Sequence, residues 1–219
     1  MVIETMEPAA TRRALRKQDR REAIVDAARE SFLEQGYAGT SMSGLLKTLG
    51  GSKATLWSYF RSKEELFAAV IEQVSASFRS DLQGILSSAG RLEAGLVAFC
   101  RRFLLTIGSP DAIATWRMVV AESGRFPELG RIFYDRAAGF TEATLSAYLA
   151  RHVTSGELRP EDPRIMAQVL ISLCTGRQNR LLWGVDIEEP GTIDLQAARF
   201  ADIFLRAYGV ASTDAPPNP

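Results

Sequence analysis

Histidine and cysteine are scarce in this sequence of 219 residues: His152 is the only histidine, and Cys100 and Cys174 are the only cysteines. A single histidine excludes most His-based catalytic triads and any metal site built from several histidines. The two cysteines are flanked by apolar residues and form no CxxC motif, which argues against a disulfide framework or a cysteine metal site. We expect both to be small core residues, with redox sensing as the alternative.

Long apolar runs are also missing. No segment approaches the roughly 18 uninterrupted apolar residues of a membrane helix, and the chain does not start with an apolar run before a small-residue cleavage site. We therefore expect a cytosolic protein with no membrane partner. The sequence has no P-loop and no GxGxxG motif that follows a strand, so we expect no cofactor, no metal and no enzymatic activity.

Lysine does not occur after Lys63, and this absence reflects an uneven distribution of charge. Residues 1–63 hold eleven basic and seven acidic residues, a net charge of +4, whereas residues 64–219 carry −4. The densest basic cluster is TRRALRKQDRR, which begins at Thr11. A basic cluster near a terminus favours binding to a polyanion, and a solvated, disordered arm is the alternative.

Strand signals are absent as well, because no alternating run bounded by hairpin turns occurs, and the pattern predicts an all-α fold. Apolar residues at helical spacing from Ile24 to Phe32 predict a helix that ends at Gly36. A capping box of Ser62 and Glu65 begins a long helix. The other predicted helices, bounded by glycine and proline breaks, cover 41–49, 52–59, 91–107, 111–123, 127–153, 163–184 and 193–208.

The stretch LGGSKATLWSYF joins two short predicted helices through its two glycines. Leu56 and Phe60, at i and i+4, can form a packing side, while Lys53, Thr55 and Ser58 face outward. Two short helices joined in this way predict a helix-turn-helix, whose second helix enters the major groove of DNA and presents its first turn to base edges.

The N-terminal region resembles the TetR family of bacterial transcriptional regulators. The matching positions, in register with the family pattern, are Ile24, Ala27, Ala28, Phe32, Gly36, Tyr37, Thr40, Gly50, Ser52, Leu56, Tyr59, Phe60, Lys63 and Leu66. The departures from that pattern are Leu46, Leu49, Gly51, Ala54 and Trp57. Farther along, WRMVVAESGRFPELGRIFYD and GELRPEDPRIMAQ are similar to the AefR-like C-terminal subgroup.

The resemblance implies two groups of DNA contacts. It places Thr40, Ser52, Trp57, Tyr59 and Lys63 near phosphates, and Ser43, Lys53, Ala54 and Thr55 near base edges. Thr40 and Ser52 can alternatively act only as helix caps, and Trp57 can be a packing aromatic. Lys63 opposes the local dipole in the first turn of its helix, which an external anion would explain, with a solvated lysine as the alternative.

The resemblance also implies that the remaining helices sense an effector and dimerise. The middle helices would hold a mainly apolar pocket, although residues at this spacing can equally be plain core. The candidate pocket residues are Phe99, Phe103, Trp116, Met118, Val120, Glu122, Phe126, Gln178, Asn179 and Arg180. The candidate dimer contacts, on the last two helices, are Met166, Val169, Leu170, Leu173, Leu181, Phe200, Ile203 and Phe204.

These expectations divide the chain into a basic flexible arm (1–19), a helix-turn-helix domain (20–66) with a linking helix to about residue 88, a ligand-binding and dimerisation domain (91–208) and a disordered tail (209–219). The predicted protein is a homodimeric, ligand-responsive transcriptional regulator, more specifically a repressor. Its partners would be a palindromic double-stranded DNA operator, a second copy and an unidentified effector. The alternative is an architectural or ligand-independent DNA-binding protein.

Overall fold

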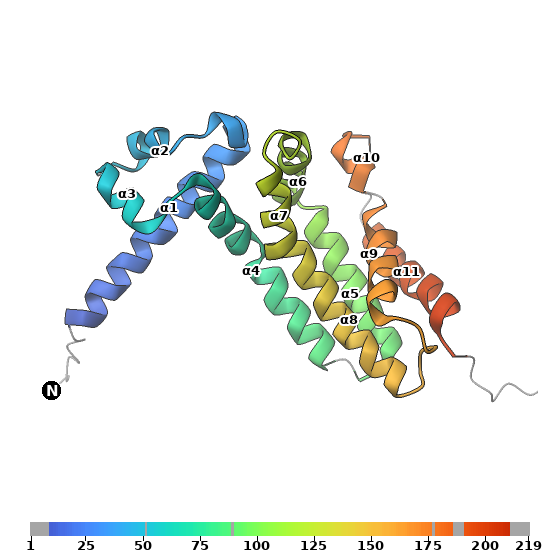
Figure 1. Cartoon of the computed structure of the whole chain (residues 1–219). Coiled ribbons are helices and arrows are strands. Elements are labelled where there is room, and N and C mark those ends of the chain that lie inside the picture. Colours follow the sequence, from blue (N-terminus) through green and yellow to red (C-terminus); the bar gives the residue numbers. More distant parts are fainter. Residues whose placement is uncertain (1–8, 51, 89, 177, 186–190, 211–219) are drawn as a thin grey trace, which may run out of the picture. The chain divides into compact units, whose positions relative to one another are not determined.

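The computed structural model describes residues 9–50, 52–88, 90–176, 178–185 and 191–210 (Figure 1). Within these residues the regular structure is helical, apart from one isolated antiparallel bridge between Leu158 and Gly209, and the all-α prediction is confirmed. The elements are α1 (Ala9–Gly39), α2 (Met42–Leu49), α3 (Lys53–Tyr59), α4 (Lys63–Ser88), α5 (Leu92–Ile107), α6 (Pro110–Glu122), α7 (Pro127–Phe133), the π-helix η1 (Tyr134–Ala138), α8 (Gly139–Thr154), α9 (Pro163–Thr175), α10 (Gln178–Leu182) and α11 (Thr192–Tyr208). Each described helix is too short or too polar to cross a lipid bilayer.

The chain forms two compact units, and neither is continuous in sequence. The first unit contains the described residues up to Val74 together with Met118–Phe133. The second unit contains the described residues of Ser75–Arg117 and those from Tyr134 onward. The helices α4 and α6 therefore each begin in one unit and end in the other. The predicted C-terminal domain, 91–208, contributes one segment to the first unit, which the sequence did not indicate.

The first unit is built around the aromatic rings of α1 and α4. Phe32 and Phe67 are buried and pack edge to face, with ring centroids 5.5 Å apart. Tyr37 packs against both rings from the last turn of α1, after the kink at Gly36. Gly36, with a φ of 74°, ends the regular part of α1 as predicted, because a positive φ is accessible to glycine at little cost.

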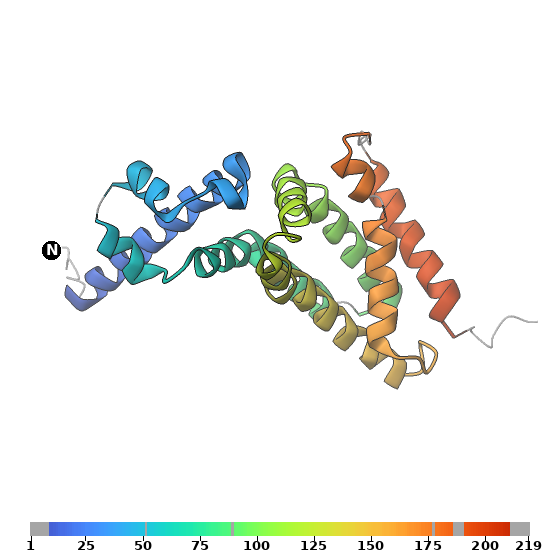
Figure 2. The same ribbon diagram turned by 45° about the horizontal axis from the view of Figure 1, so that its top comes forward.

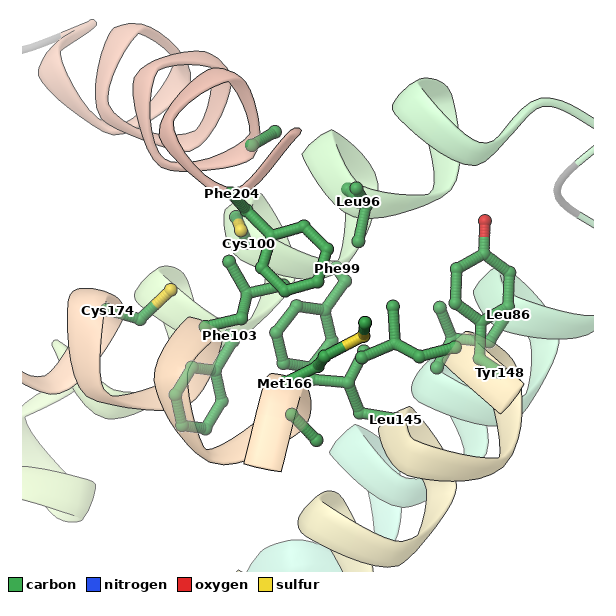
Figure 3. Close-up of a cluster of buried hydrophobic side chains, with 14 of the residues drawn as sticks. Leu86, Leu96, Phe99, Cys100, Phe103, Leu145, Tyr148, Met166, Cys174 and Phe204 are labelled. Atoms are coloured by element: carbon green, nitrogen blue, oxygen red, sulfur yellow. The ribbon is translucent and has the colours of Figure 1, made fainter. Parts of the chain in front are cut away.

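The second unit has its core between α5, α8, α9 and α11, which run alongside one another in Figures 1 and 2. Figure 3 shows Phe99, Leu145, Met166 and Phe204 gathered in this core, and all four are fully buried. The cysteines Cys100 and Cys174 are also buried here as free thiols, which is the expected core placement. A hydrogen bond between these two thiols, together with burial, raises the pKa of Cys174, so it remains protonated and unreactive.

Several element boundaries differ from the prediction. The helix expected over 127–153 contains η1, and Gly139 permits this wider turn because a Cβ there would lie 3.1 Å from the carbonyl oxygen of Tyr134. The helix expected over 163–184 is interrupted at Gly176, and α10 follows. Residues 9–19, expected as a flexible arm, form the first turns of α1. Residues 1–8, 51, 89, 177, 186–190 and the tail from 211 lie outside the described residues.

Candidate nucleic-acid interface

The two short helices α2 and α3 begin at serine caps. The Ser41 hydroxyl accepts a hydrogen bond from the amide of Gly44, and the Ser52 hydroxyl accepts one from the amide of Thr55. Ser41 rather than Thr40 is therefore the cap of α2. Gly50 ends α2 with a φ of 65°, a conformation that suits glycine in the tight turn of a helix-turn-helix.

Arg20 holds the turn between α2 and α3. Its guanidinium on α1 donates hydrogen bonds to the carbonyl oxygens of Leu49, at 3.2 Å, and Gly50, at 2.7 Å. The neighbouring Arg21 places its guanidinium carbon 5.1 Å from the ring centroid of Phe60, just after α3. The basic cluster of the sequence thus supplies two internal supports, and its composition alone did not reveal this role.

The helix α3 has one buried side and one exposed side, as its spacing predicted. Leu56 within the helix and Phe60 at its C-terminal cap are buried in the first unit. Trp57 is 39% exposed, and Tyr59 is half-buried. The other exposed positions on or before α3 are Ser52, Lys53, Ala54, Thr55 and Ser58, and Ser43 is exposed on α2. The predicted base-edge positions therefore share the solvent-facing side of the helix-turn-helix.

Thr40 does not belong to this surface. It is 1% exposed, and its hydroxyl donates a 2.9 Å hydrogen bond to the carbonyl oxygen of Gly36. The same hydroxyl lies 3.0 Å from that of Ser31. Because the side chain is enclosed and its oxygen is already hydrogen-bonded, the predicted phosphate contact of Thr40 is not supported by its position.

Lys63 is also directed into the protein rather than toward solvent. Its ammonium group donates hydrogen bonds to the carbonyl oxygens of Tyr37, at 2.8 Å, and Thr40, at 3.0 Å. It also lies 4.1 Å from the ring centroid of Tyr37, within range of a cation–π interaction. Burial lowers the pKa of the Lys63 amine. Backbone carbonyls and a ring therefore contact this charge within the first unit, and the phosphate contact of Lys63 stays a prediction.

Tyr37 connects several charged groups of the first unit. Its hydroxyl donates a 3.2 Å hydrogen bond to the carboxylate of Glu64, and burial raises the pKa of this hydroxyl. Hydrogen bonds from the Ser62 hydroxyl, from the Glu64 backbone amide and from Tyr37 lower the pKa of Glu64. Tyr37, which matched the family pattern, is thus the centre of a polar and aromatic cluster at the end of α1.

The predicted pocket residues are divided between the two units. In the second unit, Phe99 and Phe103 stack at 5.6 Å in the buried core. Trp116 on α6 is half-buried, Gln178 is buried, and Asn179 and Arg180 are exposed on α10. A surface cleft of about 600 Å³ lies beside α8 and the start of α9, and none of these residues lines it.

The other four predicted pocket residues pack in the first unit. Met118 is buried there and Val120 is exposed. Glu122 accepts hydrogen bonds from the backbone amides of Tyr37, at 2.6 Å, and Ala38, at 2.7 Å. Phe126 packs its ring at 5.2 Å from that of Tyr37. Glu122 and Phe126 thus contact the last turn of α1, and Glu122 is not a free polar anchor.

Some of the predicted dimer residues are buried in the core of their own chain, and others are exposed on its surface. Met166, Leu170 and Phe204 are 0% exposed in the core of their own chain, so they cannot form the predicted contact without unfolding it. Val169 is 36% exposed on α9 and Ile203 is 39% exposed on α11. Leu173, Leu181 and Phe200 are half-buried. Ile165 and Leu195 are further exposed apolar residues on the same helices. Helical spacing alone does not say which of two apolar stripes faces the core.

Comparisons with known proteins agree with this arrangement. A family model of bacterial regulatory proteins of the tetR family matches residues 24–70, and one of the AefR-like transcriptional repressor C-terminal domain matches residues 94–210. The transcriptional regulator BetI of Rhizobium meliloti is 32% identical over 52% of this chain and 56% of its own length, so the match spans about half of each protein.

Two solved structures match this chain over nearly their whole length. The flavonoid-responsive regulator FrrA is 33% identical, with a TM-score of 0.76, over 89% of this chain and 100% of that one. A structure described as a TetR-family transcriptional regulator from Mesorhizobium loti is 26% identical, with a TM-score of 0.77, over 89% of this chain and 99% of that one.

Proposed function

Because this chain belongs to the TetR family of DNA-binding transcriptional regulators, which are not enzymes, we propose that it acts as a homodimeric repressor on a palindromic operator under the control of a small molecule. The observation that supports DNA binding is the exposed side of α3. Leu56 anchors this helix in the core, and Arg20 binds the carbonyl of Gly50 in the turn before it. Lys53, Ala54 and Thr55 occupy its first turn, from which a recognition helix reads base edges.

The DNA contacts that we propose are a subset of those in the family pattern. Ser43, Lys53, Ala54 and Thr55 would face base edges, and Ser52, Trp57 and Tyr59 would lie near phosphates. Thr40 and Lys63 are left out, because their polar groups are bound inside the protein.

The proposed subunit contact uses the exposed side of α9 and α11. Ile165, Val169, Leu195 and Ile203 are large apolar residues that the chain leaves in solvent on these two helices. Pairing these helices with those of a second copy would bury all four in a four-helix arrangement. A two-fold axis through this contact would give the dimer two recognition helices and match a palindromic site.

For the effector we propose an aromatic, mainly apolar molecule. FrrA is named as flavonoid-responsive, and its likeness to this chain extends over nearly the full length of both. The described core of the second unit contains the stacked pair Phe99 and Phe103, which an aromatic ligand could approach by local rearrangement of α5. A thermal-shift screen that begins with flavonoids tests this class, and a screen in which no compound stabilises the protein would favour ligand-independent DNA binding.

Selection of bound duplexes from a random DNA pool tests the function as a whole. We expect an inverted repeat whose half-sites are centred about one helical turn apart, roughly 34–36 Å. The Lys53→Ala variant should relax the preference at one symmetric pair of positions, at a cost of about 1–3 kcal/mol if a bidentate base contact is lost. An equal loss of affinity on selected and scrambled duplexes would make Lys53 a phosphate contact, and failure to enrich any sequence would contradict operator binding.

A further inference from the structure

A cleft of about 790 Å³ lies in the second unit, beside the C-terminal end of α11. Three segments that are distant in sequence line it: the start of α5, the loop between α8 and α9, and the last residues of α11 with those that follow. Each segment contributes one arginine, namely Arg91, Arg159 and Arg206. Three guanidinium groups on one hollow surface repel one another, and an anion bound among them would remove this repulsion.

Backbone contacts hold the loop between α8 and α9 against the end of α11. The amide of Arg159 donates a 2.8 Å hydrogen bond to the carbonyl oxygen of Tyr208. The preceding residue, Leu158, is 2% exposed and pairs with Gly209 in the antiparallel bridge. The backbone of Arg159 is therefore fixed beside the last turn of α11, which carries Arg206.

All three guanidinium groups retain donors that can serve a ligand. Among the described residues, the guanidinium of Arg159 has no hydrogen-bond or ion-pair partner. Arg206 contacts Asp202 on its own helix through two nitrogens, at 3.2 and 2.7 Å, and keeps its other N–H donors. Arg91 lies 3.5 Å from Glu93, and both side chains are mostly exposed, so this pair contributes little and is readily exchanged.

The lining also contains two carboxylates, Glu93 and Glu157. Oε1 of Glu157 accepts a 2.9 Å hydrogen bond from the hydroxyl of Ser155, and the same oxygen lies 3.0 Å from Nδ1 of His152. Neither Ser155 nor His152 lines the cleft, so these contacts draw the carboxylate toward the wall. With three arginines against two glutamates, the lining keeps an excess of positive charge and favours an anionic ligand.

The rest of the lining is small or apolar. Gly90, Gly156 and Gly209 add no side chain to the wall. Leu205, which is half-buried, and Val210, which is 53% exposed, offer apolar surface within the same cleft. Ligand sites in proteins commonly combine such surface with a few polar groups that orient the ligand. The cleft therefore suits an anion with an organic body better than a bare inorganic ion.

We propose that this cleft binds an organic phosphate. The phosphate group lies among the three arginines, and the organic body contacts Leu205 and Val210. A phosphate monoester carries roughly two negative charges at neutral pH, so it matches several guanidinium groups better than a single carboxylate does. Guanidinium groups bind such oxygens in paired, charge-assisted hydrogen bonds. This binding is separate from the proposed function and needs no DNA.

Calorimetric titration of the full chain tests the proposal with defined probes. The two phosphate esters are adenosine monophosphate and a hexose phosphate, and their uncharged counterparts are adenosine and the free hexose. We expect at least one ester to bind with a dissociation constant of about 1 mM or lower at low ionic strength, because salt screens exposed charges. The uncharged counterparts should not bind. Inorganic phosphate should bind at least about fivefold more weakly than the ester, since it lacks the organic body.

Arg159→Gln is the main variant, because this guanidinium has no partner in the described part of the chain and its loss leaves the fold intact. We expect it to weaken ester binding about tenfold, as for the loss of hydrogen bonds to a charged group. Arg199→Gln is the matched control, since Arg199 is exposed on α11 and does not line the cleft. Glu93→Gln should instead tighten binding about two- to fivefold, because it releases Arg91 and removes a negative charge from the lining.

Hydrogen exchange locates the bound ester. The ester should slow exchange in residues 90–93, 156–159 and 205–210 of the wild type, and less so in Arg159→Gln at the same concentration. Dissociation constants above about 10 mM for both esters would overturn the proposal. So would equal losses of affinity in Arg159→Gln and Arg199→Gln, or slowed exchange confined to other segments. Inorganic phosphate that binds as tightly as the esters would overturn the assignment to an organic ligand. Thermal unfolding without ester checks that each variant folds like the wild type.

Discussion

Arg20 on α1 donates a 2.7 Å hydrogen bond to the carbonyl oxygen of Gly50, thirty residues later in the chain. This contact fixes the turn that separates the two helices of the DNA-binding motif. Arg20, which appears in the sequence as part of a basic cluster, therefore supports the turn before the recognition helix. We expect its removal to lower the stability of the protein and its affinity for the operator.

We expect Arg20→Ala to lower the free energy of unfolding by about 1.5 kcal/mol, the lower end of the range for hydrogen bonds to a charged group, because the turn carbonyls can regain water. Affinity for the selected duplex should fall more than affinity for scrambled DNA, since α3 loses its fixed position. Urea unfolding and fluorescence anisotropy provide the measurements. Lys17→Ala, at an exposed position of α1, is the control and should unfold like the wild type.

Thr40→Val should destabilise the first unit by about 1–2 kcal/mol, because it removes the hydroxyl that hydrogen-bonds to the carbonyl of Gly36 and lies beside the hydroxyl of Ser31, and leaves that carbonyl with the backbone amide of residue 40 alone. At temperatures well below the melting transition, binding to DNA should remain close to that of the wild type. A tenfold loss of affinity without a change in thermal stability would show instead that the hydroxyl contacts a phosphate.

Lys63→Ala should reduce stability and leave the dependence of DNA affinity on salt nearly unchanged. The ammonium group is bound to two loop carbonyls, so it is not available to displace a counterion from DNA. The slope of log affinity against log salt, measured beside the wild type, decides this point. A slope for Lys63→Ala that is lower than that of the wild type by about one per subunit would show that Lys63 contacts a phosphate.

Adjacent positions on α11 distinguish the dimer surface from the core. Ile203→Glu places a carboxylate on the exposed apolar side and should give a folded monomer at micromolar concentration. Phe204→Glu places the same charge in the core, where the side chain is 0% exposed, and should prevent folding. Sedimentation and circular dichroism separate the two outcomes. A folded dimer in the Ile203→Glu variant would exclude this side of α11 from the contact.

The hydrogen bonds to Glu64 predict a dependence of stability on pH. They lower the pKa of this carboxyl group in the folded state, so its stabilising contribution is complete above the unfolded value of about 4.3. The contribution is lost as the pH falls through the lower folded value. The difference in unfolding free energy between the wild type and Glu64→Gln should therefore be constant above about pH 6 and shrink toward pH 3. Glu30→Gln, at an exposed position of α1, is the control for removing a charge.

The local parts of the fold and site followed from the sequence. The spacing of Leu56 and Phe60 separates the buried side of α3 from the side that carries Lys53, because helical periodicity depends only on neighbours in the chain. The glycine end of α1 and the cap at Ser52 have the same local origin.

Partners distant in sequence could not be predicted in this way. The unfavourable position of Lys63 indicated that the charge needs a partner, yet it did not indicate the two backbone carbonyls that the ammonium group contacts 23 and 26 residues earlier in the chain. Glu122 contacts a residue 85 positions away, and only the folded chain brings them together. On α9, Met166 and Val169 are equally apolar, and the neighbouring helices decide that the first is core and the second is exposed.

The first unit is assembled from Met118–Phe133 as well as from the residues up to Val74, and this has a consequence for synthesis of the protein on the ribosome. When residues up to 74 have left the exit tunnel, the amides of Tyr37 and Ala38 still lack their carboxylate and the ring of Tyr37 lacks that of Phe126. Completion of the helix-turn-helix unit therefore waits until residue 133 has emerged. The nascent chain therefore cannot complete its DNA-binding unit until more than half of the polypeptide has been translated.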